Sequence, residues 1–313
     1  MKKLSLAYFG SPDFAARFLE KLITDTTINQ LIEVKFVVTQ ADKPVGRKQI
    51  LTPTPVKIVA NKYLKSEDIK FFSLSRLGVP AVIKNLDIEL KNIDLALVYA
   101  YGDLIPKEIL SLPKYGFWNI HPSLLPKYRG TSPIATPLIN GDKITGVTII
   151  KMDEEIDHGP IIVQNCLTIE DDDKRPDLEK KLTDLGVKLF KKILIDEGEK
   201  FFSLSGLGVQ PQNHSLATYT KKLSKQDGFI SFEKIKNLFL HPTPYALQTF
   251  YNLFRGLYPW PGIWTTLPNG KRLKITQLEL LRTTPYSLRP VKVQLEGKNE
   301  VDFETFNKAY KIF

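Results

Sequence analysis

Apolar and polar residues follow each other in blocks along the first part of the chain. Residues 4–9 form an apolar run that ends in a turn at Gly10, so they predict a buried strand. Pro12 and Asp13 stand where a helix commonly begins. Apolar residues then recur at the spacing of one helical face: Phe14, Phe18, Leu19 and Leu22. Because residues 34–38 are again apolar, the pattern predicts a strand, a helix and a second strand.

The same alternation continues to about residue 120. Helices are predicted at residues 55–62 and 79–90, and strands at residues 69–72 and 93–99. This order indicates an α/β fold, a Rossmann-like mostly parallel sheet with helices on both faces. Ligands of such sheets bind at the carboxyl ends of the strands. We therefore expect functional residues just after positions 9, 38, 99 and 120.

The pattern changes after Gly146. Two apolar runs flank an acidic stretch at residues 153–160 and predict a hairpin. Residues 178–194 have the spacing of an amphipathic helix. Residues 203–215 are rich in Gly, Ser, Gln and Asn, which is typical of an interdomain linker. Residues 216–313 combine a helical stretch, Pro- and Trp-rich turns and short strand-like runs, so they predict a smaller C-terminal β-barrel (OB-like) domain.

Length and charge both agree with two domains. The chain has 313 residues, which is enough for about two separate cores. Residues 214–313 hold 15 Lys and Arg against 7 Asp and Glu, and so supply most of the net charge of +10. A basic C-terminal part beside a near-neutral remainder fits a polyanionic partner, and it fits a solvated basic surface equally well. Charge alone does not choose between the two.

Composition narrows the class of protein further. A single cysteine, Cys166, excludes an internal disulfide framework and a cysteine-rich zinc site. No stretch reaches the roughly 20 apolar residues that a membrane helix needs. The first apolar run stops at Gly10, which is too early for a signal peptide. We therefore expect a cytoplasmic protein.

The densest group of polar and structure-breaking residues lies at positions 119–130. In a strand, Asn119 and His121 lie on the same side. An amide and an imidazole at a strand end can donate two hydrogen bonds to one developing oxyanion. Pro122 ends the strand, and Pro126 is expected to keep the next segment extended, with its backbone groups free for a flat ligand. An isolated Asn-x-His more often bonds local backbone, but the paired prolines favour a site here.

The acidic loop offers a carboxylate partner for this group. Asp153 and Asp157 flank a tight turn, where an aspartate commonly caps its own backbone. If Asp157 meets His121 in space, it can orient the imidazole and favour its charged form. A metal held by His121, Asp157 and His158 is disfavoured because their spacing matches no zinc pattern. The chain also has no GxGxxG after the first strand, no GxSxG and no P-loop.

A third polar segment, residues 40–49, follows the second predicted strand. Pro44 and Gly46 interrupt regular structure there, while Lys43, Arg47 and Lys48 carry cations. The segment is either a mobile solvated loop or a clamp for an anionic partner. In the second case, Arg47 suits bidentate contact with a phosphate.

Together, these motifs resemble the folate-dependent formyltransferases. The resemblance covers nearly the whole chain, and its central motif is residues 119–126 with Arg129 and Gly130, followed by Met152, Asp153 and residues 157–159. Residues 9–14 and 98–102 match as well. Three further features are similar to the branch of the family that acts on tRNA: the loop at residues 39–47, the segment at residues 218–225, and the basic tail after residues 259–262.

The resemblance implies transfer of a formyl group from 10-formyltetrahydrofolate to the amino group of methionine on initiator tRNA, by a monomer and without a metal. Residues 1–202 are then the catalytic domain, residues 203–215 the linker and residues 216–313 the basic tRNA-binding domain. Carried over by position, the site residues fall into three groups. The catalytic residues are Asn119, His121 and Asp157, those against the folate are Ser123, Leu124, Leu125 and Pro126, and those near the tRNA are Lys43, Arg47 and Lys48.

This chemistry agrees with the residues. An amine that attacks a formyl carbonyl passes through a tetrahedral oxyanion, which Asn119 and a protonated His121 can stabilise while Asp157 holds His121. The chain departs from the family pattern at Glu155, where Gly is usual, and at His158, where a small or hydroxyl residue is common. A side chain at position 155 disfavours a positive-φ turn in this loop.

Three other functions stay open. The first is formyl transfer to a nucleotide-sugar amine or a glycinamide ribotide, and the second is hydrolysis of formyltetrahydrofolate. The third is a tRNA-binding module whose catalytic half is degenerate. The basic tail and the Arg47 loop speak against the first, and the presence of Asn119, His121 and Asp157 speaks against the third.

Overall fold

The computed structural model describes residues 3–46, 48–64, 71–72, 80–196, 209–282 and 287–310. The chain divides into two compact units. The N-terminal unit comprises residues 1–130, 146–167 and 179–219, and the C-terminal unit comprises residues 131–145, 168–178 and 220–313. Two segments of the C-terminal unit therefore precede the predicted linker in the sequence. Of that linker, residues 203–208 lie outside the described residues.

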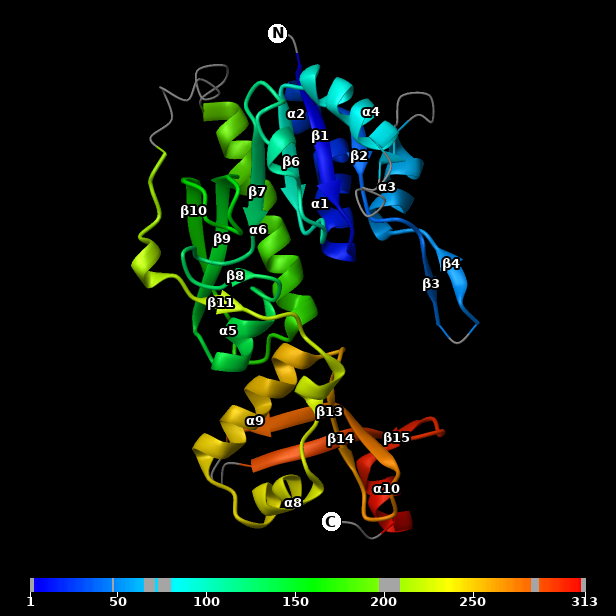
Figure 1. The fold of residues 1–313 in the computed structure, drawn as a ribbon. Coiled ribbons are helices and arrows are strands. Elements are labelled where there is room, and N and C mark those ends of the chain that lie inside the picture. Colours follow the sequence, from blue (N-terminus) through cyan, green and yellow to red (C-terminus); the bar gives the residue numbers. More distant parts are fainter. Residues whose placement is uncertain are drawn as a thin grey trace. The chain divides into compact units, whose positions relative to one another are not determined.

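A seven-stranded sheet forms the centre of the N-terminal unit (Figure 1). Its order is β10-β9-β7-β6-β1-β2-β5. The strands are β1 (Leu4–Gly10), β2 (Ile32–Val38), β5 (Phe71–Phe72), β6 (Leu95–Tyr99), β7 (Phe117–His121), β9 (Ile144–Lys151) and β10 (Ile161–Thr168). The neighbours β7-β6-β1-β2-β5 all pair in parallel, whereas β9 is antiparallel to β7. Because strand order reverses between β1 and β6, we expect a ligand to bind at the carboxyl ends of these two strands.

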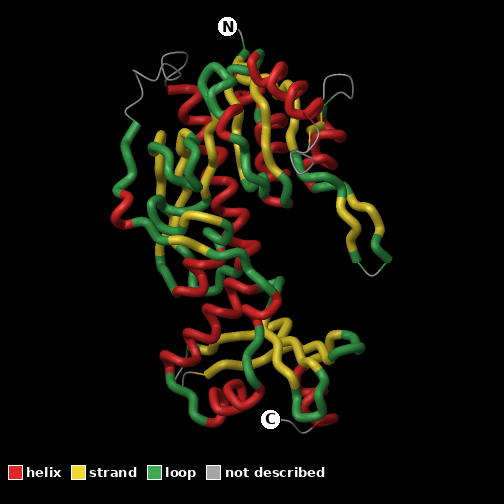
Figure 2. The backbone as a smooth tube through the Cα atoms, in the orientation of Figure 1, coloured by secondary structure: helices red, strands yellow, loops and turns green. Residues whose placement is uncertain are grey.

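Helices cover both faces of this sheet, which confirms the Rossmann-like α/β prediction (Figure 2). They are α1 (Asp13–Thr24), α2 (Thr26–Leu31), α3 (Pro55–Tyr63), α4 (Pro80–Lys91) and α6 (Arg175–Asp196). Strand β6 is buried along its whole length, as expected for a parallel strand with helices on either side. Helix α1 buries Phe18, Leu19 and Leu22, which belong to the predicted apolar face. No helix in the described part of the chain is long and apolar enough to cross a membrane.

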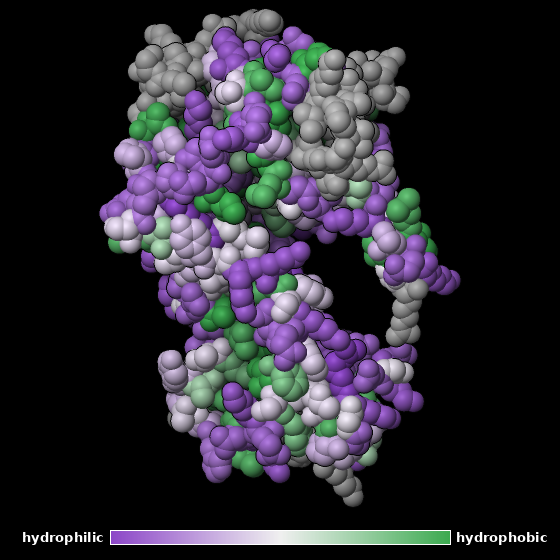
Figure 3. Space-filling view, in the orientation of Figure 1, coloured by the Kyte–Doolittle hydropathy of each residue, from purple (hydrophilic) through white to green (hydrophobic). Residues whose placement is uncertain are grey.

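The polar segment after β2 forms a two-stranded hairpin, which projects from the sheet in Figure 2. Its strands are β3 (Lys43–Val45) and β4 (Ile50–Thr52), and all six of their residues are exposed. Apolar side chains gather on this ribbon in Figure 3, because Val45, Ile50 and Leu51 are each more than half exposed. A second two-stranded sheet joins β8 (Arg129–Gly130) and β11 (Tyr219–Thr220).

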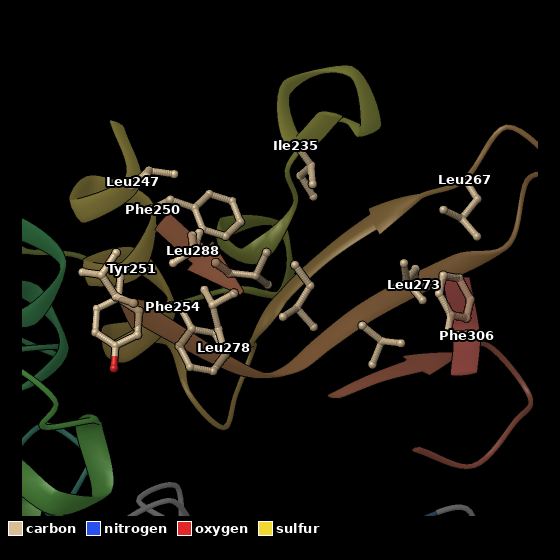
Figure 4. Close-up of a cluster of buried hydrophobic side chains, with 14 of the residues drawn as sticks. Ile235, Leu247, Phe250, Tyr251, Phe254, Leu267, Leu273, Leu278, Leu288 and Phe306 are labelled. Carbon is tan, nitrogen blue, oxygen red and sulfur yellow. The ribbon is translucent and has the colours of Figure 1, made fainter. Parts of the chain in front are cut away.

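The C-terminal unit is built on a four-stranded antiparallel sheet of order β12-β13-β14-β15. The strands are β12 (Ile263–Thr266), β13 (Arg272–Leu281), β14 (Ser287–Leu295) and β15 (Glu300–Asp302); the helices are α5 (Ala135–Asn140), α8 (Phe232–Leu240), α9 (Pro244–Leu257) and α10 (Phe303–Tyr310). One apolar cluster joins α9, the sheet and α10, with Phe254, Leu278 and Phe306 buried in it (Figure 4). The small β domain is confirmed in this sheet, and its closure into an OB-like barrel stays a prediction.

Helix α9 explains why the two earlier segments belong to this unit. It packs against α5, and Gly256 lets the two helices approach closely. Its Arg255 is only 3% exposed and donates to the carbonyl oxygens of Glu170 and Asp173. Backbone carbonyl groups from residues 168–178 thus bind Nη1 of the buried guanidinium.

Candidate active site

Strand β7 ends in two side chains that meet the same carboxylate. Asn119 pairs in register with Val98 of β6, close to the point where strand order reverses. Its Nδ2 donates to Asp157 Oδ1 over 3.0 Å, and Nδ1 of the buried His121 lies 3.4 Å from the same oxygen. The structure thus confirms that Asn119 and His121 share a face of β7. It also brings Asp157 to them, which the sequence could state only as a condition.

The loop between β9 and β10 holds Asp157 in an unusual backbone conformation. Asp157 has a φ of +51°, a region that side-chain-bearing residues adopt infrequently. Glu155 is not among the positive-φ residues, so the side chain at this position does not prevent the turn. The second oxygen of Asp157 accepts a hydrogen bond from the Gly130 backbone N–H at 2.7 Å. Both carboxylate oxygens are therefore held in place.

His121 is held from both sides of its ring. Its Nε2 lies 3.0 Å from the carbonyl oxygen of Tyr128, a residue that also has a positive φ, +64°. A carbonyl can only accept, so Nε2 carries a hydrogen in this arrangement. Nδ1 faces the carboxylate and donates to it when that nitrogen is protonated as well. The ring thus bridges Asp157 and the turn that follows β7.

The environment of Asp157 sets its charge. Burial alone would raise the pKa of this carboxyl group, but interactions with three neighbouring residues outweigh burial. The charge and hydrogen bond of His121, the Gly130 N–H and the Arg129 charge together lower the pKa below its ordinary value. Asp157 is consequently a carboxylate at neutral pH.

The segment 123–126 differs in part from the expectation. Its backbone was expected to be free for a flat ligand, yet Leu125 donates its N–H to Thr148 Oγ1 and accepts from Gln164 through its carbonyl oxygen. Ser123 is fully buried and donates its hydroxyl to the Lys127 carbonyl. The extended-backbone argument was wrong on this point, because the neighbouring strands β9 and β10 satisfy these groups. Side chains, chiefly those of the partly exposed Leu124 and Pro126, are what this segment can present to a ligand.

The three cationic residues predicted to lie near tRNA differ in what the structure shows of them. Lys43 is exposed, but its Nζ donates to Gln40 Oε1 at 2.9 Å at the base of the hairpin. Lys48 is exposed in the turn, and Arg47 lies outside the described residues. Within the described part of the chain, no group of three or more His, Cys, Asp or Glu side chains is arranged to hold a metal ion.

Comparison with known proteins gives the family. A family model named "Formyl transferase" matches residues 2–194, and one named "Formyl transferase, C-terminal domain" matches residues 245–309. The chain belongs to the formyl transferase family. A methionyl-tRNA formyltransferase of Caldicellulosiruptor saccharolyticus is 41% identical over 99% of this chain and 98% of its own length. One of Staphylococcus aureus strain N315 is 37% identical over 89% of this chain and 80% of its own.

Solved structures agree with the fold of this formyltransferase. A 4-N formyltransferase from Francisella tularensis covers 90% of this chain and 99% of its own, with a TM-score of 0.63. At 20% identity this likeness concerns the fold alone.

Several groups in the formyltransferase site have no signature in the sequence. The Tyr128 carbonyl and the Gly130 N–H are backbone groups, so residue type says nothing about them. Gln212 also reaches the Asp157 loop, although it falls in the segment predicted as a linker. Its low exposure of 5% and its hydrogen bond to this loop appear only in the structure.

Proposed function

We propose that this chain transfers the formyl group of 10-formyltetrahydrofolate to the amino group of methionine on initiator tRNA, acting as a monomer in the cytoplasm. One observation carries the proposal: the Asp157 carboxylate contacts both the Asn119 amide and the His121 imidazole at the carboxyl end of β7. Such a group suits acyl transfer, in which negative charge develops on a carbonyl oxygen.

Asn119 and His121 act on the developing oxyanion. The Asn119 amide has two N–H groups and uses one on Asp157, so the other is free to donate to the formyl oxygen. The protonated His121 ring adds positive charge beside it. The amine nitrogen bonds to the formyl carbon and gives the tetrahedral oxyanion; when the carbonyl re-forms, the bond from that carbon to the folate nitrogen breaks. The proton that the amine loses balances the proton that the folate nitrogen gains.

Asp157 orients its partners more than it removes protons. A general base works best when its pKa lies near the operating pH, and the pKa of Asp157 is lowered instead. Its carboxylate fixes the Asn119 amide and the His121 ring, and it stabilises the positive charge on the amine nitrogen in the intermediate. The proton then leaves through water.

The acceptor follows from the relatives and from charge. The two relatives described above, which match 99% and 89% of this chain, bear the name methionyl-tRNA formyltransferase. Residues 214–313 are strongly basic, and Lys48 lies exposed on the projecting hairpin. Both features suit a phosphate-rich acceptor better than a small sugar amine. Lys43, Arg47 and Lys48 are the proposed contacts of the hairpin with tRNA. Leu124 and Pro126 are the proposed side-chain contacts with the folate, and the buried Ser123 and Leu125 are proposed to support them from below.

The test is formyl transfer from 10-formyltetrahydrofolate to methionine-charged initiator tRNA, with charged elongator tRNA and no tRNA as controls. We expect formylmethionyl-tRNA with the initiator alone. Folate turnover without formylated tRNA would instead indicate hydrolysis or another amine acceptor, and would overturn the proposed acceptor.

A further inference from the structure

Gln212 touches the backbone of the loop that carries Asp157. Its Nε2 donates to the carbonyl oxygen of Asp157 at 2.9 Å and to that of Gly159 at 2.7 Å. Both hydrogen bonds hold the turn at Asp157, the residue with the positive φ. A non-glycine residue in this conformation costs free energy and persists only when its surroundings hold it. Gln212 supplies such a hold without contacting the carboxylate itself.

Arg129 fixes which way the Gln212 amide points. Arg129 is 1% exposed, and its Nη2 donates to Gln212 Oε1 at 2.6 Å. With its oxygen committed to the guanidinium, the amide must turn its NH₂ group toward the two loop carbonyls. Arg129 precedes Gly130, whose N–H binds Asp157 Oδ2. Gly130 thus holds the Asp157 carboxylate, while Arg129 acts on the Asp157 backbone through Gln212.

A pair of histidines ties the same chain segment to the loop a second time. His214 lies in the 3₁₀ turn His214–Leu216, and its Nδ1 accepts a hydrogen bond from Arg129 Nη2 at 2.8 Å. Its ring stacks on that of His158, with centroids 3.9 Å apart and planes within 7°. His158 in turn lies 2.6 Å from an oxygen of Asp153, at the start of the loop. Residues 212–214 thus contact the end of the loop at residues 157–159, and His158 links that end to Asp153 at its start.

We propose that Gln212 is a positioning residue for formyl transfer: oriented by Arg129, it holds the Asp157 turn so that the carboxylate faces Asn119 and His121. Gln212 and His214, which fall in the segment that the sequence presents as a linker, thus support the catalytic centre. The inference rests on the proposed function, since it concerns the rate of that reaction. Misplacing a catalytic group by about 1 Å can lower the rate about 10²-fold.

The test compares Gln212→Glu with Gln30→Glu in steady-state formyl transfer. Glutamate keeps the size of glutamine and an acceptor for Arg129, but at neutral pH it has no N–H for the two carbonyls. Gln30 is exposed near the end of α2, so Gln30→Glu makes the same chemical change away from the site. We expect Gln212→Glu to lower kcat by about 10- to 100-fold, up to the scale of a catalytic group misplaced by about 1 Å. The KM values for folate and tRNA should stay within about twofold of wild type, as should every constant of Gln30→Glu.

His214→Ala provides a second, milder variant. His214 is exposed, so its loss should be tolerated, and it removes the histidine stack and one acceptor of Arg129 while leaving Gln212 intact. We expect kcat to fall about threefold to tenfold with KM unchanged, below the effect of Gln212→Glu.

The outcomes separate the two proposals. A wild-type enzyme that formylates no tRNA overturns the proposed function. An active wild type with full kcat in Gln212→Glu, or with only a raised KM there, overturns the positioning role. If Gln212→Glu does not fold, Gln212→Asn takes its place, because its amide is one methylene shorter, and a full kcat in that variant rejects the role. A full kcat in His214→Ala removes only the histidine pair from the proposal.

Discussion

At the scale of single residues, the proposed mechanism gives the Asn119 amide two acceptors, Asp157 and the formyl oxygen. One N–H is bound to Asp157 Oδ1, which holds the side chain in one orientation. The amide is thus preorganised, because no rotation is needed when charge develops on the formyl oxygen. Donors fixed in this way contribute more to the rate than donors that must reorganise.

We therefore expect Asn119→Ala to lower kcat about 10²- to 10³-fold, the cost of removing one oxyanion donor. Steady-state formyl transfer to methionyl initiator tRNA measures the effect. Asn165→Ala, on the exposed part of β10, is the matched control and should keep wild-type turnover. Near-normal turnover in Asn119→Ala would remove Asn119 from this role.

The sequence could place some of these residues but not all of them. Asn119 and His121 follow from the two-residue period of a strand. Asp157 lies 38 residues from Asn119, so only the fold decides that they meet. The Tyr128 carbonyl and the Gly130 N–H are invisible to any argument from side-chain type. Gln212 was hidden for another reason: its polar surroundings in the sequence are typical of a linker.

At the scale of secondary-structure elements, the packing of α9 on α5 depends on the absence of one side chain. A Cβ at Gly256 would lie 2.5 Å from Ile139 Cγ1 and 2.8 Å from the backbone oxygen of Ala135. The backbone oxygen cannot move without displacing α5. Glycine costs free energy inside a helix, but here it allows an approach that no other residue permits.

Gly256→Ala should consequently destabilise the protein by about 1–3 kcal/mol, the range for overpacking a well-filled contact. Urea unfolding of the full chain measures this change. Thr249→Ala, on the exposed side of the same helix, should stay within about 0.5 kcal/mol of wild type. A stabilised Gly256→Ala variant would mean that helix propensity outweighs the contact.

The β3–β4 hairpin was not predicted from the pattern of apolar and polar residues. Pro44 and Gly46 indicated interrupted structure, yet Pro44 lies within β3. An isolated two-stranded ribbon tolerates proline, because each strand has a free edge where no N–H is needed. Gly46 makes the turn with a φ of +73°. The alternation of apolar runs was enough for the main sheet, whose central strands β1 and β6 are largely buried, but not for this exposed ribbon.

At the scale of the whole molecule, charge is distributed unevenly along the chain. Residues 214–313 carry an excess of eight positive charges, while the longer remainder is near neutral. Lysines that contact phosphates release counterions when tRNA binds, so the binding constant falls steeply with salt. Lys222 is exposed beside the turn Lys225–Gly228 and is suited to such a contact.

Lys222→Ala should reduce the slope of log K for tRNA binding against log salt by about one unit, the value for one lost phosphate contact. Binding of initiator tRNA is measured over a series of salt concentrations. Lys188→Ala, an exposed lysine on α6, should leave the slope unchanged. An unchanged slope in Lys222→Ala would mean that this lysine is only solvated.

The discontinuous C-terminal unit limits how this protein can be recombined. Three separate stretches of chain build it, and the buried Arg255 depends on carbonyl groups of a stretch more than 80 residues earlier. A chimera joined by one crossover near residue 210 would pair α9 with a foreign α5 and foreign carbonyl groups. Such a hybrid folds well only when the donor sequences match at all three stretches. The C-terminal part of the chain is therefore not an independently exchangeable module, because its packing depends on residues 131–145 and 168–178.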